Sequence, residues 1–326
     1  MRSGRVLLSL LDSASNFASF EIKFDCNTSN TLKSLTLRAK QPSEKECCKY
    51  FARTVISTAQ MLRASDKRLY RLWREIYSMS AVIPAEHCGI LYSDFLSILS
   101  RKRCVNRYLE IGVQRGRLLS KIHANYAVGV DPFFDIDSNI SANKNICTLI
   151  RVGSDEFFSR YQYHEIAGGE PDLAFLDGMH TFEFLLRDFY NTERISRKST
   201  LIGMHDCLPL NAEMAIRDES SAVAAGAGGL FHMWWTGDVW KIVPILQRYR
   251  PDLRIVCVDC PPTGIVFVTN LDPFSTVLND NYHSIVREYH SMPNDLKAIE
   301  KLFSEIEVVP STKILNEFDH SLYFST

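Results

Sequence analysis

Tyr108-Leu109-Glu110-Ile111-Gly112-Val113-Gln114-Arg115-Gly116 is the stretch of the chain that decides the fold. The apolar run over residues 107–111 predicts a buried strand, and the glycines after it allow a tight turn into a helix. The same glycines let the backbone approach a bound ligand closely. The stretch therefore predicts a strand followed by a ligand-binding loop, although a tight turn with close helix packing would use the same glycines.

Short apolar strands alternate with amphipathic helices from Asn106 onward. Strands are predicted over residues 107–111, 127–130, 147–151, 173–176, 200–204, 253–258 and 265–269. This alternation is typical of a doubly wound α/β fold with a mostly parallel sheet, here of seven strands. The connection Pro261-Pro262-Thr263-Gly264 fits a hairpin, so we expect the last strand to be antiparallel.

We expect three regions along the chain. Residues 1–100 form an N-terminal region, strand-like over Phe20–Phe24 and mainly helical from about residue 44, where apolar residues recur near the helical period. Residues 101–272 form the core domain, and residues 273–326 form a tail with one helix at 294–306. Within the core, the Ala/Gly-rich run at Ala222–Gly229 predicts a loop.

Composition excludes several classes of protein. With 326 residues, 46% of them hydrophobic, the chain is neither disordered nor fibrous. The 37 basic and 38 acidic residues give a net charge of -1, so nucleic acid is not an expected partner. The early apolar run Val6–Leu11 is far shorter than the roughly 18 residues that cross a bilayer, and we therefore expect a cytoplasmic protein without a membrane span.

Acidic residues lie where a nucleoside ligand of a doubly wound sheet would bind. Asp131 ends the second strand, about 20 residues after the first, where a carboxylate holds ribose hydroxyls. A dinucleotide fingerprint needs a glycine where this chain has Gln114, and Glu110 is an unfavourable neighbour for pyrophosphate. A carboxylate there suits a cationic ligand that carries an amino acid, such as S-adenosylmethionine.

The motifs together resemble those of class I S-adenosylmethionine-dependent methyltransferases, over roughly residues 106–270. The matching motifs, in order, are Glu110-x-Gly112-x-x-x-Gly116, Asp131, Ser154-Asp155, Asp172 to Asp177 and His205-Asp206. More narrowly, the chain resembles the small-molecule and sugar O-methyltransferase branch, methyltransferase family 24. That likeness is carried by Leu176-Asp177-Gly178-Met179-His180-Thr181, His205-Asp206-Cys207-Leu208-Pro209 and Gly237-Asp238-Val239-Trp240-Lys241.

The resemblance implies a role for each donor-side residue. Gly112 and Gly116 would shape the methionine-binding loop, and Glu110 would lie beside the donor. Asp131 would hold the ribose hydroxyls. Ser154 and Asp155 would approach the adenine ring, although both residue types also cap helices at this position.

The resemblance also implies the catalytic residues, Asp177 and His180. Methyl transfer to a hydroxyl needs in-line positioning and removal of the hydroxyl proton, which a histidine can accept near neutral pH. In the sugar-methylating relatives an Asp at the strand end binds a divalent metal, and a His three residues later acts as base; Asp177 and His180 share that spacing. The alternative for His180 is local packing before the next helix.

His205-Asp206 ends the fifth strand, where metal-dependent relatives place two oxygen ligands. The resemblance therefore implies that Asp177, His205 and Asp206 bind a divalent metal, magnesium or manganese. A histidine in place of an oxygen ligand favours manganese or zinc over magnesium. Without a metal, His205 and Asp206 would orient the acceptor or complete a base network, which makes His205 a third candidate catalytic residue.

The function predicted from these residues is O-methylation of a small-molecule or sugar hydroxyl. Four aromatic residues are candidates for a lid that covers such an acceptor: Phe231, Trp234, Trp235 and Trp240. For Trp240, packing in the core is an equal alternative. The alternatives are an N-methyltransferase that uses the same pocket, and a donor-binding interaction module without catalysis. Donor-binding and catalytic residues occur together in this chain, which favours an enzyme.

Overall fold

The computed structural model describes residues 2–11, 17–26, 32–40, 82–317 and 322–324. The chain divides into two units, Met1–Arg71 and Leu72–Thr326. In the first unit, three antiparallel strands form a sheet in the order β1-β2-β3: β1 (Arg2–Leu11), β2 (Phe17–Cys26) and β3 (Leu32–Lys40). The strand-like stretch Phe20–Phe24 lies in β2, whereas the helices predicted between about residue 44 and residue 81 lie outside the described residues.

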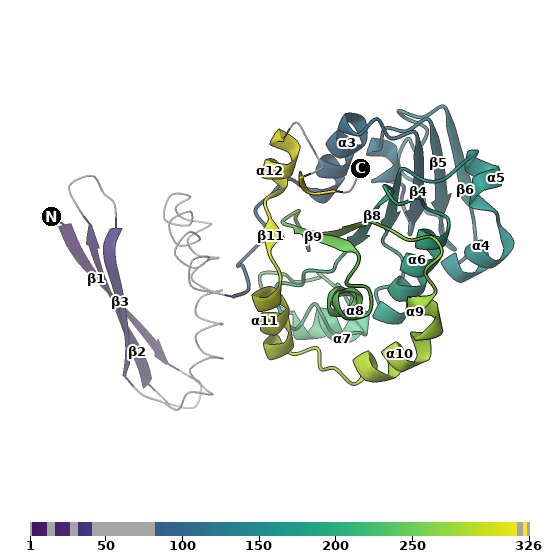
Figure 1. Cartoon of the computed structure of the whole chain (residues 1–326). Coiled ribbons are helices and arrows are strands. Elements are labelled where there is room, and N and C mark those ends of the chain that lie inside the picture. The colour runs from purple at the N-terminus through teal and green to yellow at the C-terminus, as the bar shows by residue number, and fades with distance from the viewer. Residues whose placement is uncertain (1, 12–16, 27–31, 41–81, 318–321, 325–326) are drawn as a thin grey trace. The chain divides into compact units, whose positions relative to one another are not determined.

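The second unit is built on an eight-stranded sheet in the order β11-β9-β10-β8-β7-β4-β5-β6 (Figure 1). Neighbouring strands from β6 to β8 are parallel, and β10 is antiparallel to both β8 and β9. The predicted doubly wound fold with an antiparallel last core strand is confirmed. The strands are β4 (Arg107–Ile111), β5 (Tyr126–Val130), β6 (Ile146–Ile150), β7 (Leu173–Leu176), β8 (Leu201–His205), β9 (Arg254–Val258), β10 (Ile265–Thr269) and β11 (Val308–Val309).

The C-terminal region departs from the sequence prediction in two respects. The sheet has eight strands instead of seven, because β11 pairs in parallel with β9 and is too short to show a two-residue period. The predicted helix at 294–306 is α11, but three more helices flank it, and α12 packs into the core. These helices are α9 (Val277–Asp280), α10 (Tyr282–His290), α11 (Leu296–Glu305) and α12 (Ser311–Asn316).

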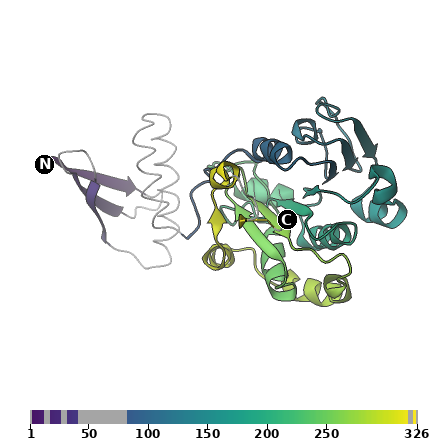
Figure 2. The same cartoon turned by 45° about the horizontal axis from the view of Figure 1, so that its top comes forward.

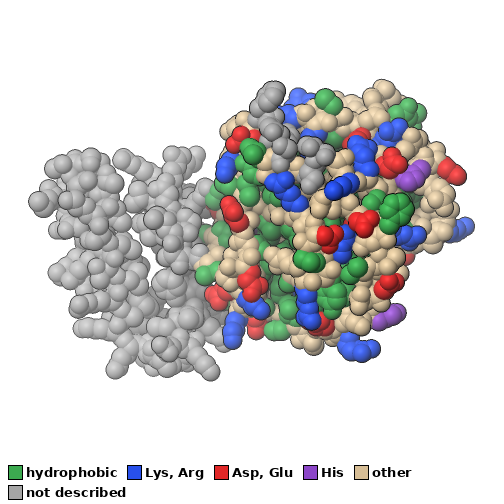
Figure 3. All heavy atoms as spheres, in the orientation of Figure 1, with side chains coloured by type: hydrophobic (Ala, Val, Ile, Leu, Met, Phe, Trp, Pro, Cys, Tyr) green, Lys and Arg blue, Asp and Glu red, His purple; other side chains and the backbone are tan. Residues whose placement is uncertain are grey.

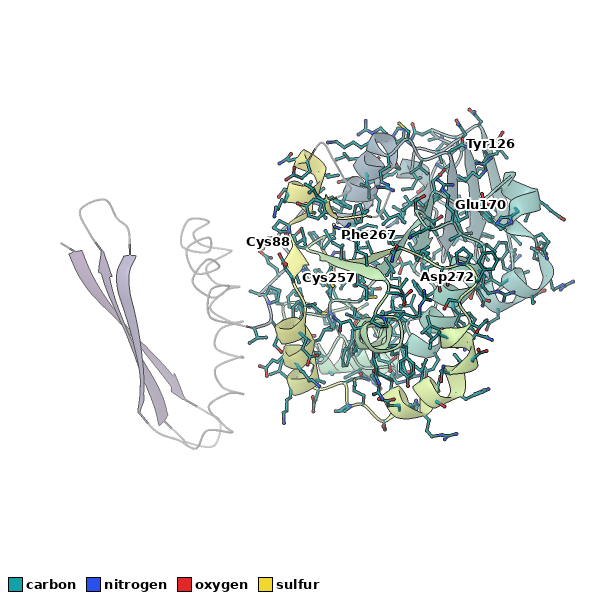
Figure 4. All side chains as sticks on the ribbon, viewed as in Figure 1. Cys88, Tyr126, Glu170, Cys257, Phe267 and Asp272 are labelled. Atoms are coloured by element: carbon teal, nitrogen blue, oxygen red, sulfur yellow. The ribbon has the colours of Figure 1, made fainter. Side chains whose placement is uncertain are left out.

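Helices cover both faces of the sheet (Figures 1 and 2). On one face lie α3 (Tyr92–Lys102), η1 (Leu119–Lys121) and α12, where Phe95 packs against Phe267, with 5.9 Å between ring centroids. Figure 4 labels Phe267 in this interior. On the other face lie α6 (Phe182–Arg194), α8 (Ile242–Tyr249), α10 and α11. Helix α3, placed before residue 101 in the sequence prediction, is thus part of the core.

The remaining helices lie in the connections. They are α4 (Ser154–Arg160), α5 (Tyr163–Ala167), α7 (Glu219–Ala225) and η2 (Val239–Lys241). The prediction of a loop at Ala222–Gly229 was wrong for its first half, because residues 222–225 belong to α7. The side chain of Asp218 caps this helix by accepting a hydrogen bond from the backbone N–H of Ser221 at 2.8 Å. Alanine has the highest helix propensity, so a capped alanine run becomes a helix.

Two features of the surface bear on the sequence predictions. In the part of the chain that the structure describes, no helix is both long and apolar enough to cross a bilayer. On the face shown in Figure 3, basic and acidic side chains are interspersed, in keeping with the net charge of -1.

Candidate active site

Gly112 is the point where three strand ends meet. Its backbone N–H donates to Val130 O at the end of β5, at 2.9 Å. Its φ is +87°, and a Cβ at this position would lie 1.9 Å from the carbonyl oxygen of Asp177, just after β7. Only glycine fits this approach. The predicted loop glycine therefore brings the loops after β4, β5 and β7 together.

Asp131 is fixed by the backbone on both sides of its carboxylate. Oδ2 accepts from the N–H of Gln114 at 2.8 Å, and Oδ1 accepts from the N–H of Phe133 at 2.7 Å. The side chain is nearly buried. Each carboxylate oxygen has a second lone pair, so both can still accept a hydrogen bond from a ligand.

Glu110 lies inside the sheet, one residue before the end of β4. Its Oε2 accepts from the hydroxyl of Tyr108 at 2.6 Å, and the residue is 2% exposed. Burial raises the pKa of Glu110 to about 8, against the opposing effect of the Tyr108 bond. A cation beside this carboxyl would favour its ionised form.

Gly116, the second glycine of the predicted donor loop, is also required by the backbone. Gly116 has a φ of +71°, and a Cβ there would meet Ile140 Cγ2 at 2.4 Å, so this loop also needs glycine.

Ser154 and Asp155 begin α4 but do not cap it, because Gly153 occupies the N-cap position. Both carboxylate oxygens of Asp155 are bound by Arg187, at 2.8 and 2.9 Å.

Four ionisable side chains gather after β7 and β8. Nε2 of His180 lies 3.7 Å from Asp177 Oδ1 and 3.3 Å from Asp206 Oδ2. Nδ1 of His205 lies 3.4 Å from Asp177 Oδ1 and 3.3 Å from Asp206 Oδ2. The two carboxylates thus face two imidazoles, and the structure brings all the predicted catalytic and metal residues into one cluster.

The charges of the cluster shift one another's pKa values. Burial alone would lower the pKa of His180, but attraction to Asp206 and Asp177 outweighs it and raises the pKa to about 9. Burial likewise opposes the charge of Asp177, but His205 and His180 hold the pKa of that carboxyl well below its usual value. The pKa of His205 is raised by the same two carboxylates, again against burial. Within this cluster, the imidazoles are therefore protonated and the Asp177 carboxyl is ionised at neutral pH.

Asp206 is held in an uncommon conformation. Its φ is +59°, in the left-handed region that few residues other than glycine adopt, although aspartate tolerates it better than most. The hydroxyl of Thr263, in the hairpin between β9 and β10, donates to Oδ1. Oδ2 therefore remains directed at the two histidines.

Asp177, His180 and Asp206 have the spacing of a metal site. Their ligand atoms lie within 4.8 Å of one another, as they would around one cation. The predicted set contained His205 instead of His180. The ring of His205 packs on Tyr92, with 4.3 Å between ring centroids, and among the described residues its Nε2 has no hydrogen-bond partner. Two carboxylates with an imidazole suit manganese or zinc better than magnesium.

The sequence does not predict the environment of three further residues, Tyr92, Trp235 and Asp188. Tyr92, the first residue of α3, covers the ring of His205, and no local motif marks it. Trp235 stacks on His180, with 4.7 Å between ring centroids, a contact that its predicted place in a lid does not indicate. Trp240, from the same predicted lid, is 2% exposed and lies in the core. Asp188, on α6, is only 2% exposed although aspartate is usually found at the surface, and burial raises its pKa to about 7.

Comparison with known proteins agrees with this geometry. Residues 109–207 match the family model described as a methyltransferase domain, which confirms the predicted resemblance and an enzyme of the transferase class. This segment runs from β4 to the residue after Asp206, so it contains the donor-side loops and the four-residue cluster. No curated protein matches the chain in sequence.

Three solved structures are similar to part of this chain. The cofactor-bound protein Rv0187 from MTB is 14% identical, with 71% of this chain and 99% of that chain covered and a TM-score of 0.40. For the O-methyltransferase from Bacillus cereus in complex with SAH, the identity is 12%, the coverage 67% and 99%, and the TM-score 0.36. The N-methyltransferase NodS from Bradyrhizobium japonicum WM9 is 12% identical, with 55% of this chain and 95% of that chain covered and a TM-score of 0.32. At such low scores, the activities of these proteins do not transfer to this chain.

Proposed function

We propose that this protein, whose residues 109–207 match the model of a methyltransferase domain, transfers a methyl group from S-adenosylmethionine to a hydroxyl of a small molecule or sugar. The observation that carries the proposal is the position of Nε2 of His180 between the carboxylates of Asp177 and Asp206, at the carboxyl ends of β7 and β8. Ligands of doubly wound sheets bind at this edge.

The donor would bind over the loops after β4 and β5. Asp131 would accept hydrogen bonds from the two ribose hydroxyls through the free lone pairs of its oxygens. Gly112 and Gly116 would leave room for the methionine part, and Glu110 would face its positive charge. Ser154 would approach adenine, whereas Asp155 would act through the Arg187 pair that holds α4 against α6.

His180 would remove the proton of the acceptor. The acceptor oxygen attacks the methyl carbon as the carbon–sulfur bond breaks, the proton passes to Nε2 of His180, and S-adenosylhomocysteine leaves as a neutral thioether. The base must lose its own proton before each turnover. We expect Asp206 and Asp177 to hold the ring in place and to stabilise the imidazolium that forms.

A divalent cation fits the same carboxylates. Asp177 and Asp206 would hold it with Nδ1 of His205, which lies against both carboxylates, as the imidazole ligand; Nε2 of His180 then stays available for the acceptor proton. When bound, the cation would polarise the acceptor hydroxyl and lower its pKa.

The base favours oxygen over nitrogen as the acceptor. A neutral amine already offers a lone pair, so its methylation needs no proton removal before attack, whereas a hydroxyl reacts well only as it loses its proton. The exposed side chains of Met233 and Trp234, next to the Trp235 ring on His180, would contact the acceptor.

The test is mass spectrometry of the protein incubated with methyl-labelled donor and a panel of sugars, phenols and amines. We expect label on one class of hydroxyl compound. Transfer to amines alone would establish the N-methyltransferase alternative. Binding of donor without transfer to any panel member, together with an unaltered donor after long incubation, would favour the non-catalytic module.

A further inference from the structure

We propose that the segment Trp235–Asp238 is the positioning element of the base: it fixes the His180 ring with its Nδ1 protonated and Nε2 directed at the carboxylates. The segment lies outside the matched domain at residues 109–207 and 55 residues along the chain from His180. The inference rests on the proposed function for its catalytic meaning, whereas the ring geometry itself can be measured without any acceptor.

Trp235 contacts both the edge and the face of the His180 ring. Its carbonyl oxygen lies 3.2 Å from Nδ1 of His180. A carbonyl only accepts, so Nδ1 must carry a proton. The two rings stack with an interplanar angle of 26°. Nε2 is then the ring nitrogen left to exchange a proton at the carboxylates.

Gly237 packs on the backbone of His180. Its φ is +58°, and a Cβ built on it would lie 1.8 Å from the carbonyl oxygen of His180 and 3.0 Å from its Cβ. A side chain here would therefore displace the His180 backbone or the segment itself. Glycine at this position gives the close approach on which the Trp235 contacts depend.

Asp238 anchors the segment to the helix that follows His180. It is fully buried, and its Oδ1 accepts from the N–H of Phe182, the first residue of α6, at 3.1 Å. Oδ2 accepts from Arg217 at 2.6 Å and from the buried Lys241 at 3.1 Å. Because Phe182 lies two residues after His180, this buried carboxylate holds the segment Trp235–Asp238 close to His180.

Two further hydrogen bonds hold the other side of the segment. The indole N–H of Trp235 donates to the carbonyl of Ile216 at 2.8 Å, and the N–H of Thr236 donates to the carbonyl of Met214 at 2.9 Å. The segment is thus bound on one side to residues 214–216 and on the other to α6. His180 lies against a fixed surface and not against a free loop.

The decisive variant is Gly237→Ala, with Gly228→Ala as its matched control. Gly228 also has a positive φ, +76°, but no atom lies within 4 Å of a Cβ built there, so its variant reports the backbone strain alone. We expect Gly237→Ala to lower kcat by about 100-fold, the usual cost of a displacement of about 1 Å at a catalytic group. The affinity for S-adenosylhomocysteine should stay within about twofold, and Gly228→Ala should retain its activity.

A double variant separates positioning from general damage. In a His180→Ala background, Gly237→Ala should cause no further loss of kcat, because the residue through which it acts is gone. Trp235→Phe keeps the carbonyl and an aromatic face but loses the indole bond to Ile216, and we expect a loss of only a few-fold. This milder variant also serves if Gly237→Ala does not fold.

Nitrogen chemical shifts of the His180 ring give a readout that needs no acceptor. In the wild type, at a pH where the ring is neutral, we expect the proton on Nδ1; in Gly237→Ala we expect a mixture of the two tautomers. A wild-type ring protonated on Nε2, or equal effects of Gly237→Ala with and without His180, would overturn the proposal. A protein with the expected tautomer that methylates nothing would instead count against the proposed function.

Discussion

The carboxylate of Asp131 should account for much of the affinity for the donor. Its oxygens already accept one backbone hydrogen bond each, so a ribose diol would add one to each oxygen. A hydrogen bond to a charged group contributes about 1.5–3 kcal/mol. Asp131→Asn keeps one acceptor oxygen and should weaken binding of S-adenosylhomocysteine by about 10- to 150-fold. Asp131→Ala loses both and should weaken it by at least about 100-fold.

Titration calorimetry with S-adenosylhomocysteine measures both variants against a matched control. Asp137→Asn removes a carboxylate from the same connection, but this side chain is 40% exposed and pairs with Arg117 on the surface. Its effect should be about twofold or less, as is usual for surface substitutions. Wild-type affinity in Asp131→Ala would refute the placement of the donor, and so would an equal loss in the Asp137 control.

Three further predictions follow from the ionisable groups. Binding of the cationic donor near pH 7 should release a proton, because the pKa of Glu110 is raised to about 8 and a neighbouring cation favours its ionised form. Calorimetry in buffers of different ionisation enthalpy measures this release, and Glu110→Gln should abolish it. Chelation should stop turnover, and manganese should restore it at least as well as magnesium, whereas turnover unaffected by chelator would exclude a cation at Asp177 and Asp206. Burial raises the pKa of Asp188 from 3.8 to about 7, so the folded protein binds more protons than the unfolded chain between these values and loses stability as pH rises. Denaturant unfolding should show that the free energy of unfolding of Asp188→Asn, relative to that of the wild type, rises by about 2–3 kcal/mol between pH 5 and pH 8. If the unfolding free energies of the two proteins change in parallel with pH, the raised pKa of Asp188 is contradicted.

The sequence predicts the core of this site because the fold brings the ends of consecutive parallel strands together. Gly112, Asp131, Asp177 and Asp206 each follow a strand by one or two residues, so placing the strands also placed them. The period-two and apolar patterns that mark the strands are strong, and every core strand predicted from them exists with bounds that differ by at most one residue.

Contacts between distant segments explain what the sequence did not predict. Tyr92 reaches His205, and Trp235 reaches His180, only through tertiary packing. The direction of a loop side chain is likewise not fixed by spacing, which is why the three-ligand group contains His180 and not His205. The bidentate pair of Asp155 with Arg187, from a helix later in the chain, is likewise a contact that the sequence does not predict.

The rate of methyl transfer by His180→Ala, measured in a single turnover with donor bound, tests the central claim most directly. Loss of a positioned general base typically slows a reaction by about 10²- to 10⁴-fold, and the fold and donor affinity should be unchanged. Because the pKa of His180 is raised to about 9, the wild-type rate should rise with pH through that value, and the variant should lack this rise. A variant rate within about threefold of wild type, with the same pH dependence, would contradict the claim and move the search for the base to His205.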